Sequence, residues 1–547
     1  MKKIYWLLLA IIAFGLFFRL YNIGLADVIT DEALIAIRSI GYIDFFVSPY
    51  QTTPYEWFSD IPLWAKLSFH DHPPLVFLIQ NLSFKIFGIN IFGLRLPFVL
   101  AGLFSIYFMY LIGQKLFDKK IGLLASLFLS VSCYHIWISR IGLQESIVIC
   151  LSLLAFYLFI KAIESGNYWQ WGIVLGLAFL TKYTSFILLP IFFIYLLIYK
   201  RFVFKDKRFY FGLLIALIIF SPVIIYNLKL YQARGHFDLQ FSYLFNQQVD
   251  EWQFLPGKIQ AGSFLNRLFN LIPSLYLGLL WPMFISVVVS VFYAVYYFYK
   301  TKNKNILLIL LTIAFYLISF LLTGPMKRFV VTLVPFLFLI LAWFIINQKS
   351  KAIKYILVFI LVTSEIFFSF NTLLVDYPIG KQGIAYSYLK TESYSWGYNQ
   401  LDNYLTQLLK DKTPSVTFTT KYQFLENIKE KALANDKQKN LENKGFLLIY
   451  DANMFDLATL WIFHRRLIYQ GWPVITVDTY LSQNKDFWIS QGVSNFYFFK
   501  IADSKILQQP ELNKTSAAVQ LASKLKVNPE IIKRPDGREV FEVYSWQ

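Results

Sequence analysis

Two groups of acidic side chains stand out in the N-terminal part of a largely apolar sequence. Asp31 and Glu32 are adjacent, and Asp71 lies between His70 and His72. A carboxylate beside a bilayer is costly if it meets hydrocarbon, so these side chains are expected to face water or a cavity and to mark a functional site. A low-dielectric surrounding raises the pKa of a carboxyl group and makes it a competent general base. Asp31, Glu32 and Asp71 are therefore candidate catalytic residues. The competing interpretation of the first pair is that it only complements a helix dipole.

The histidines beside Asp71 raise the question of a metal. A single His-x-His pair without a third histidine nearby is a weak signal for metal ligation, so no metal site is predicted and a divalent cation is kept only as an alternative. Contact of His72 with a phosphate, or orientation of Asp71, agrees better with the pattern. Further charged residues near the ends of hydrophobic runs are candidates for substrate or phosphate binding: Arg95, Arg140, Glu145, Lys182, Lys327 and Arg328. For the cations, the competing interpretations are anchoring at the interface and, for Arg95, pairing with Asp31 or Glu32.

The composition predicts what must position these residues. Of the 547 residues, 57% are hydrophobic and only 15% are charged, whereas a soluble domain has about 25% charged residues. The chain is therefore predicted to be a polytopic α-helical membrane protein. About eleven hydrophobic runs are candidate transmembrane helices: residues 4–20, 92–116, 121–138, 146–163, 168–181, 183–199, 209–229, 269–299, 305–323, 328–347 and 354–373.

The basic residues predict the orientation of these runs. The net charge of +18 would suggest a nucleic-acid partner in a soluble protein, but basic turns on the cytoplasmic side explain it better in a membrane protein. No nucleic acid is therefore expected. Counting spans puts the basic turns and the N-terminus in the cytoplasm, and the loops 21–91 and 230–268 outside. The first run is expected to remain as an uncleaved span. The prediction is a multi-pass protein of the cell membrane, in contact with its lipids.

Two short interfacial helices are predicted in the first outer loop. Thr30 can cap a helix that begins at Asp31 and stops at Gly41. A second helix, from Leu75 to Ile86, is too short to span the bilayer easily.

From about residue 375 the composition becomes polar. Short apolar runs at 446–450, 474–477, 496–499 and 540–544 alternate with helix-like segments such as 401–409. This alternation predicts an α/β domain large enough to hold its own core. The expected organisation is a transmembrane catalytic domain over residues 1–374 and an extracytoplasmic α/β domain over residues 375–547.

Together these features resemble the GT-C membrane glycosyltransferases, in particular the superfamily of protein O-mannosyltransferases and the ArnT-like lipid A aminoarabinose transferases. The resemblance covers about residues 1–345. It rests on Thr30-Asp31-Glu32-Ala33, Asp71-His72-Pro73-Pro74-Leu75, Gly93-Leu94-Arg95-Leu96-Pro97, Ser139-Arg140 leading to Glu145, Thr181-Lys182-Tyr183, and Lys327-Arg328.

The resemblance implies a GT-C fold and an inverting enzyme at the outer membrane face. Such an enzyme transfers a sugar from a polyprenyl-phosphate donor to a hydroxyl group of a protein, lipid or glycan. By the same resemblance Asp31 is the base on the acceptor, Glu32 shapes the acceptor site, and Asp71 is a further acidic position. His72 matches a contact of the donor phosphate, and Arg95 matches an arginine of the mannosyltransferases.

Two departures and two competing functions accompany this resemblance. Glu145 stands where the family more usually has an aspartate, and nothing resembles the β-trefoil insertion of eukaryotic protein mannosyltransferases. A transporter or flippase of a lipid-linked substrate would also have many spans and buried charges, but it should carry them near mid-span in paired halves. Here the charges gather at the outer ends of the spans, which favours interfacial chemistry. A catalytically inert scaffold for the C-terminal domain is the third hypothesis.

Overall fold

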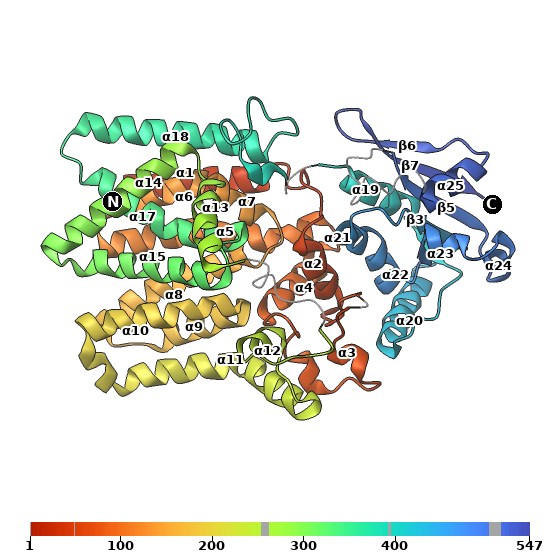
Figure 1. The fold of residues 1–547 in the computed structure, drawn as a ribbon, viewed down its shortest axis with the longest axis horizontal. Coiled ribbons are helices and arrows are strands. Elements are labelled where there is room, and N and C mark those ends of the chain that lie inside the picture. Colours follow the sequence, from red (N-terminus) through yellow and green to blue (C-terminus); the bar gives the residue numbers. More distant parts are fainter. Residues whose placement is uncertain (1, 49, 253–261, 392–394, 503–515) are drawn as a thin grey trace. The chain divides into compact units, whose positions relative to one another are not determined.

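The computed structural model describes residues 2–48, 50–252, 262–391, 395–502 and 516–547, and helices make up most of it (Figure 1). Part of the predicted outer loop 230–268, residues 253–261, lies outside these ranges. The chain forms two compact units that interleave in sequence. Residues 1–23, 44–54 and 61–391 form the first, called here the membrane unit, and residues 24–43, 55–60 and 392–547 form the second, called the C-terminal unit. The predicted division at residue 374 stays a prediction.

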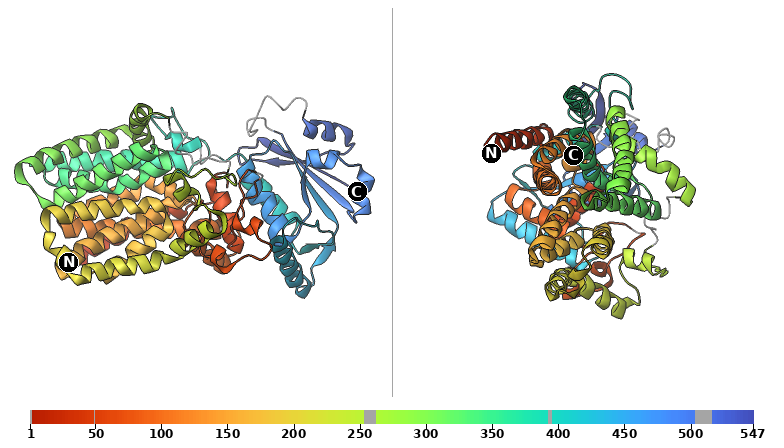
Figure 2. Two further views of the ribbon diagram at one scale, coloured as in Figure 1. Left: turned by 60° about the horizontal axis from the view of Figure 1, so that its bottom comes forward. Right: turned by 90° about the vertical axis from the view of Figure 1, so that its left-hand side faces the viewer.

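The membrane unit consists of long apolar helices that pack side by side (Figure 2). Its helices are α1 (Lys2–Leu20), α4 (Leu75–Phe87), α5 (Ile91–Leu116), α6 (Lys119–Val131), α7 (Cys133–Arg140), α8 (Glu145–Ser165), α9 (Trp169–Thr181), α10 (Leu188–Tyr199), α11 (Lys207–Arg234), α12 (Leu239–Leu244), α13 (Phe264–Tyr276), α14 (Trp281–Thr301), α15 (Lys304–Thr323), α16 (Lys327–Val330), α17 (Val334–Ile346) and α18 (Lys351–Leu373). Short 3-10 turns η1 (Leu63–Lys66), η2 (Tyr183–Ile187), η3 (Arg201–Lys205), η5 (Val331–Leu333) and η6 (Tyr388–Thr391) connect them.

Within the described residues, seven helices are long and apolar enough to cross a membrane, or up to eight if the bent pair α6–α7 is one span. Four shorter apolar helices, at residues 4–20, 75–87, 169–181 and 183–199, accompany them. Each predicted hydrophobic run lies on one or two of these helices. The chain is thus a multi-pass membrane protein, and the count of about eleven spans stays a prediction.

The bend between α6 and α7 shows how a break between two apolar helices is tolerated. The two helices meet at an angle of 60°, which leaves backbone groups without their helical partners. Side chains of α18 supply replacements, because the Glu365 carboxylate accepts from the Cys133 amide at 3.0 Å and the Ser369 hydroxyl donates to the Val131 carbonyl at 2.6 Å. Irregular backbone at membrane depth requires such internal partners.

The predicted helix after Thr30 is confirmed as α2 (Asp31–Gly41). The Thr30 hydroxyl accepts from the Glu32 amide at 3.4 Å, and Tyr42 ends the helix in the left-handed conformation with φ of 50°. This helix groups with the C-terminal unit. The second predicted helix is confirmed as α4, and a short helix α3 (Pro54–Trp57) lies between them in sequence.

A five-stranded sheet forms the core of the C-terminal unit, in the order β4-β3-β5-β7-β6. Strand β3 (Phe446–Tyr450) pairs in parallel with β4 (Val474–Thr476) and β5 (Asn495–Ile501), and β7 (Glu539–Trp546) pairs antiparallel with β5 and β6 (Glu530–Lys533). Strands β1 (Lys412–Pro414) and β2 (Glu442–Lys444) form a separate parallel pair. The four predicted strands are confirmed, whereas β1, β2 and β6 were not predicted because they are short and polar.

Helices cover both faces of this sheet. Alternate residues point to opposite faces of a strand. Leu447, Ile449 and Phe498 pack with residues of α23 (Val477–Leu481), α24 (Lys485–Ser490) and α25 (Ala517–Lys524). On the other face, Tyr450 stacks on Phe463, and Phe499 packs against the same ring at a tilt. The remaining elements are α19 (Tyr398–Leu408), α20 (Gln423–Gln438), α21 (Asp456–Thr459), the π-helical turn η7 (Leu460–His464) and α22 (Arg465–Gln470).

Candidate active site

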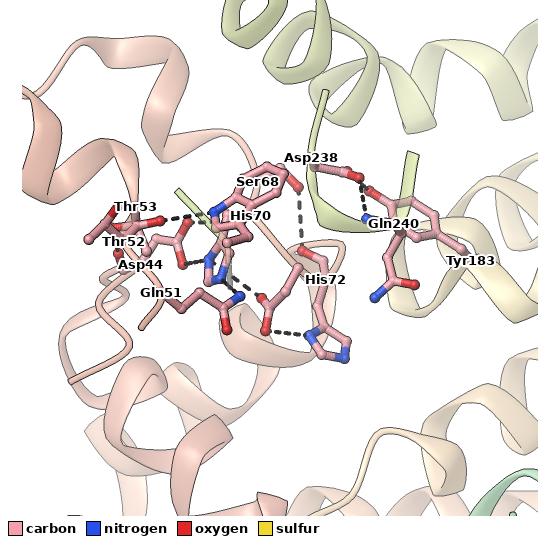
Figure 3. Close-up of polar contacts among 12 residues, drawn as sticks. Asp44, Gln51, Thr52, Thr53, Ser68, His70, His72, Tyr183, Asp238 and Gln240 are labelled. Carbon is pink, nitrogen blue, oxygen red and sulfur yellow. Dashed lines mark hydrogen bonds and ion pairs between the residues drawn. The ribbon is translucent and has the colours of Figure 1, made fainter. Parts of the chain in front are cut away.

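A buried aspartate clamps the turn that carries Asp71. The Asp44 carboxylate accepts from both the backbone amide and the Nδ1 of His70, each at 2.7 Å (Figure 3). The other ring nitrogen of His70 lies 2.7 Å from the Gln51 amide nitrogen. Because Asp44 can only accept and the Gln51 amide nitrogen can only donate, His70 is assigned as the neutral Nδ1–H tautomer. Both Asp44 and His70 are almost fully buried.

This clamp orients the two following residues. The Asp71 carboxylate is 6% exposed, and its Oδ2 lies 3.0 Å from Nδ1 of His72. The His72 ring is 30% exposed. The His72 carbonyl accepts from the Phe69 amide at 3.3 Å, which closes the turn. The arrangement places a buried carboxylate against an imidazole that a ligand can reach.

The loop after α11 adds polar groups to the same region (Figure 3). The Leu239 amide donates to the His70 carbonyl at 2.7 Å. The adjacent Asp238 carboxylate accepts from the Tyr183 hydroxyl at 2.5 Å and from the Asn227 amide at 3.0 Å. Burial raises the pKa of Asp238 above its ordinary value, although these donors and two backbone amides oppose the shift. The loop after α11 is thus tied directly to the turn at residues 70–72.

Asp44, His70 and Asp71 form the group of described residues that could hold a metal ion, since one ligand atom from each lies within 4.8 Å of the others. However, Nδ1 of His70 donates to Asp44 and its other ring nitrogen meets Gln51. A cation would therefore have to replace one of these contacts. The hydrogen bonds already satisfy the ring, and the chemistry derived below uses no metal.

A second cluster of charged residues lies around the ring of Phe329. Lys182 lies 2.5 Å from the Glu145 carboxylate, with side chains that are 14% and 3% exposed. The Lys182 ammonium is 4.7 Å from the centre of the Phe329 ring, and the Arg328 guanidinium is 5.3 Å from the same centre. Cations at such distances are attracted to the face of an aromatic ring. The structure thus brings together three predicted site residues, Glu145, Lys182 and Arg328; Lys327 is the sequence neighbour of the last.

Arg140 is engaged with the backbone after α1. Its guanidinium donates to the carbonyls of Phe18, Tyr21 and Asn22 at 2.7 to 2.9 Å. The last carbonyls of a helix have no partner inside the helix, and Arg140 supplies a donor to one of them, that of Phe18, and to two carbonyls that follow the end of α1. This residue therefore holds the chain that leads from α1 toward α2.

Arg95 makes a similar contact one residue further along. Its Nη1 donates to the Ile23 carbonyl at 2.7 Å, and the side chain is fully buried. A role of Arg95 or Arg140 at the donor phosphate stays a prediction.

Asp31 and Glu32 occupy the first turn of α2, where a helix dipole favours negative charge. Asp31 is partly exposed and Glu32 is fully buried. Both residues belong to the C-terminal unit, whereas the turn at residues 70–72 belongs to the membrane unit.

Asp44, Gln51 and Asp238 were missed from the sequence. Asp44 stands alone in the apolar segment 43–47, and Asp238 follows Phe237 in a similar way. The signal that could have found them is the one used for Asp31, since an acid among apolar residues beside a membrane marks a functional or structural site by default. Gln51 carries no comparable signal.

The family model described as dolichyl-phosphate-mannose-protein mannosyltransferase matches residues 71–226. The match begins at Asp71 and ends in α11. It includes six of the candidate residues: Asp71, His72, Arg95, Arg140, Glu145 and Lys182.

Curated relatives match over limited stretches. A protein of Bacillus subtilis (strain 168) named "Putative mannosyltransferase YkcB" is 28% identical over 206 residues, 37% of this chain and 27% of the relative. The undecaprenyl phosphate-alpha-4-amino-4-deoxy-L-arabinose arabinosyl transferase of Wigglesworthia glossinidia brevipalpis is 32% identical over 139 residues, 24% of this chain and 25% of the relative. The matches thus span about a quarter of the length of these two relatives.

Solved structures match nearly the whole chain. ArnT from Cupriavidus metallidurans in the apo state covers 99% of this chain and 98% of its own, with a TM-score of 0.56 and 12% identity. The apo oligosaccharyltransferase of Archaeoglobus fulgidus covers 98% of this chain and 74% of its own, with a TM-score of 0.51 and 12% identity. These likenesses define the fold, a GT-C membrane domain with a C-terminal domain built on a sheet. The resemblance to mannosyltransferase-like and ArnT-like GT-C glycosyltransferases is confirmed.

Proposed function

We propose that this chain is a membrane glycosyltransferase that moves a sugar from a polyprenyl-phosphate donor to an acceptor hydroxyl group, with inversion at the anomeric carbon. The observation that supports it best is the clamped turn, in which the buried Asp71 carboxylate holds the accessible His72 ring 3.0 Å away. ArnT of Cupriavidus metallidurans has been crystallised with undecaprenyl phosphate. Undecaprenyl phosphate is therefore a suitable probe of the donor site.

The proposed reaction breaks the bond between the anomeric carbon and the phosphate oxygen. The acceptor oxygen attacks the anomeric carbon, its proton passes to the Asp31 carboxylate, and the lipid phosphate leaves as an anion. Positive charge must meet that anion in a low-dielectric site. His72, Lys182 and Arg328 are the groups assigned to it, because His72 is accessible and the other two flank Phe329.

The two adjacent acids receive different roles. Asp31 is partly exposed at the start of α2 and can exchange a proton with an acceptor. Glu32 is fully buried and is assigned to shaping the acceptor site. The acceptor is a hydroxyl group of a protein, a lipid or a glycan.

The base is tested by Asp31→Asn, with Asp60→Asn as a matched control on an exposed acid of the same loop. We expect Asp31→Asn to reduce sugar transfer at least about a hundredfold, the usual scale for a lost general base, while binding of undecaprenyl phosphate persists. Transfer by purified protein in detergent is measured with a labelled polyprenyl-phosphate sugar.

Two results would revise this assignment. Near-normal transfer by Asp31→Asn together with an inactive Asp71→Asn would move the base to Asp71. If both variants transferred sugar normally, a carboxylate base would be refuted.

The proposed location is the cell membrane, with Met1 inside and Gln547 outside. The variant Asn435→Cys tests this, because Asn435 is exposed on α20 and both native cysteines are buried. A membrane-impermeant maleimide should label it in intact cells. Labelling only after lysis would place the C-terminal unit in the cytoplasm.

A further inference from the structure

The helix that carries Asp31 and Glu32 is held at its start by the chain near α19. The Asp27 carboxylate, four residues before Asp31, is 1% exposed. It accepts from the backbone amides of Gly397 at 3.0 Å and Asn399 at 2.8 Å, and from that of Trp396. These amides lie at the N-terminal end of α19, where a helix presents free donors and positive potential.

The same junction is closed from the other side. The Asn399 side-chain amide donates to the carbonyls of Gly24 at 2.8 Å and Ala26 at 2.9 Å. Hydrogen bonds thus run in both directions across the junction, from the Asn399 backbone amide to the Asp27 carboxylate and from the Asn399 side chain to the Gly24 and Ala26 carbonyls. The segment that enters α2 has little freedom to move relative to α19.

The far end of α2 is held by Tyr469 of α22. The Tyr469 hydroxyl donates to the Ile37 carbonyl at 2.6 Å and accepts from the Gly41 amide at 3.3 Å. A methyl group on Gly41 would lie 2.8 Å from the Tyr469 ring, so the two approach closely. One phenol therefore satisfies both an acceptor and a donor in the last turn of the helix.

We propose that the C-terminal unit contributes to catalysis, and that Asp27 and Tyr469 act as positioning residues for Asp31 and Glu32. This inference rests on the proposed function. Sequence places the acidic pair before the second span, but the observed contacts of the surrounding segment 24–41 tie that segment to residues more than 350 positions away. A catalytic group displaced by about 1 Å can lose about a hundredfold in rate. The hydrogen bonds at the two ends of α2 are therefore expected to act on turnover.

The test is Tyr469→Phe, which keeps the ring and removes only the hydroxyl. The matched control is Tyr404→Phe, because the Tyr404 hydroxyl donates to the Glu530 carboxylate at 2.7 Å within the same unit, and no hydrogen bond among the described residues joins it to α2. We expect kcat to fall about tenfold in Tyr469→Phe, while KM for the donor and binding of undecaprenyl phosphate stay unchanged. Tyr404→Phe should leave kcat unchanged.

Hydrogen exchange supplies a readout that does not depend on activity. Amides of residues 37–43 should exchange faster in Tyr469→Phe than in the parent chain, and not in Tyr404→Phe. A second variant, Asn399→Ala, removes the donors to Gly24 and Ala26 and should lower kcat in the same way. It keeps the proposal testable if Tyr469→Phe fails to fold.

The possible failures are distinguishable. If Asp31→Asn abolishes transfer but Tyr469→Phe and Asn399→Ala both match Tyr404→Phe, the positioning role is refuted and the proposed function stands. If Tyr469→Phe lowers kcat and weakens donor binding equally, a general loss of structure explains it and the positioning role is also refuted. If Asp31→Asn transfers sugar normally, the assignment of Asp31 as the base fails and the positioning role fails with it.

Discussion

The clamp between Asp44 and His70 provides the sharpest prediction about the membrane unit. Asp44→Asn keeps the size of the side chain but leaves one oxygen to accept where the carboxylate accepted from two donors. Its new amide group would then face a donor of His70. A hydrogen bond to a charged group contributes about 1.5–3 kcal/mol, and an unsatisfied buried donor costs about 1–3 kcal/mol. The local free energy of opening around residues 68–74 should therefore fall by about 2–4 kcal/mol.

The expected functional result follows from this loosening. Asp71 and His72 should lose their fixed geometry, so transfer is expected to fall about a hundredfold, as for a displacement of about 1 Å. Binding of undecaprenyl phosphate should weaken as well, if His72 meets the phosphate. Hydrogen exchange of peptides covering residues 68–74 measures the opening, and a labelled polyprenyl-phosphate sugar measures transfer. Asp60→Asn is the control, because that acid is exposed.

One outcome would refute this reasoning. Suppose that Asp44→Asn matched Asp60→Asn in hydrogen exchange, in binding of lipid phosphate and in sugar transfer, while Asp71→Asn was inactive. The turn would then be held by contacts other than the clamp. The backbone bond from the Leu239 amide to the His70 carbonyl would then be the element to test.

Three further predictions concern the charged residues. Arg95→Ala should lower the melting temperature in detergent, because the Ile23 carbonyl loses its donor; normal binding of undecaprenyl phosphate by the folded variant would limit Arg95 to this backbone role. Glu145→Gln should be rescued in part by Lys182→Gln, because removing both charges avoids an unpaired buried one; thermal unfolding of the single and double variants checks this coupling. Burial raises the pKa of Asp27 to about 6, against 3.8 ordinarily, so the folded state holds this proton more tightly than the unfolded chain does. Protonation of Asp27 therefore stabilises the folded state by about 3 kcal/mol, and this stabilisation is fully present below about pH 4 and lost as the pH rises through about 6. Hydrogen exchange of the C-terminal unit between pH 4 and 7 measures this trend, which Asp27→Asn should remove.

Local patterns in the sequence determined the elements of this protein. A membrane span needs a continuous apolar run, so the runs are visible without any knowledge of partners. The start of α2 depends on the Thr30 cap, and its end lies at the predicted Gly41. The main strands of the C-terminal sheet were predicted from short apolar runs, whereas the polar strand β6 gave no such signal. The motifs at residues 30–33 and 71–75 were also sufficient for the resemblance to GT-C enzymes.

Only the tertiary structure decided which of these residues meet. Asp44 reaches His70 across 26 positions, and Glu145 reaches Lys182 across 37. Arg140, expected at a phosphate, donates to the backbone after α1. The grouping of α2 with the C-terminal unit through Tyr469 could not be predicted either. A hydrogen bond between distant residues depends on how the elements pack, and a lone tyrosine in a helix has the same local sequence whether its hydroxyl meets water or the last turn of another helix.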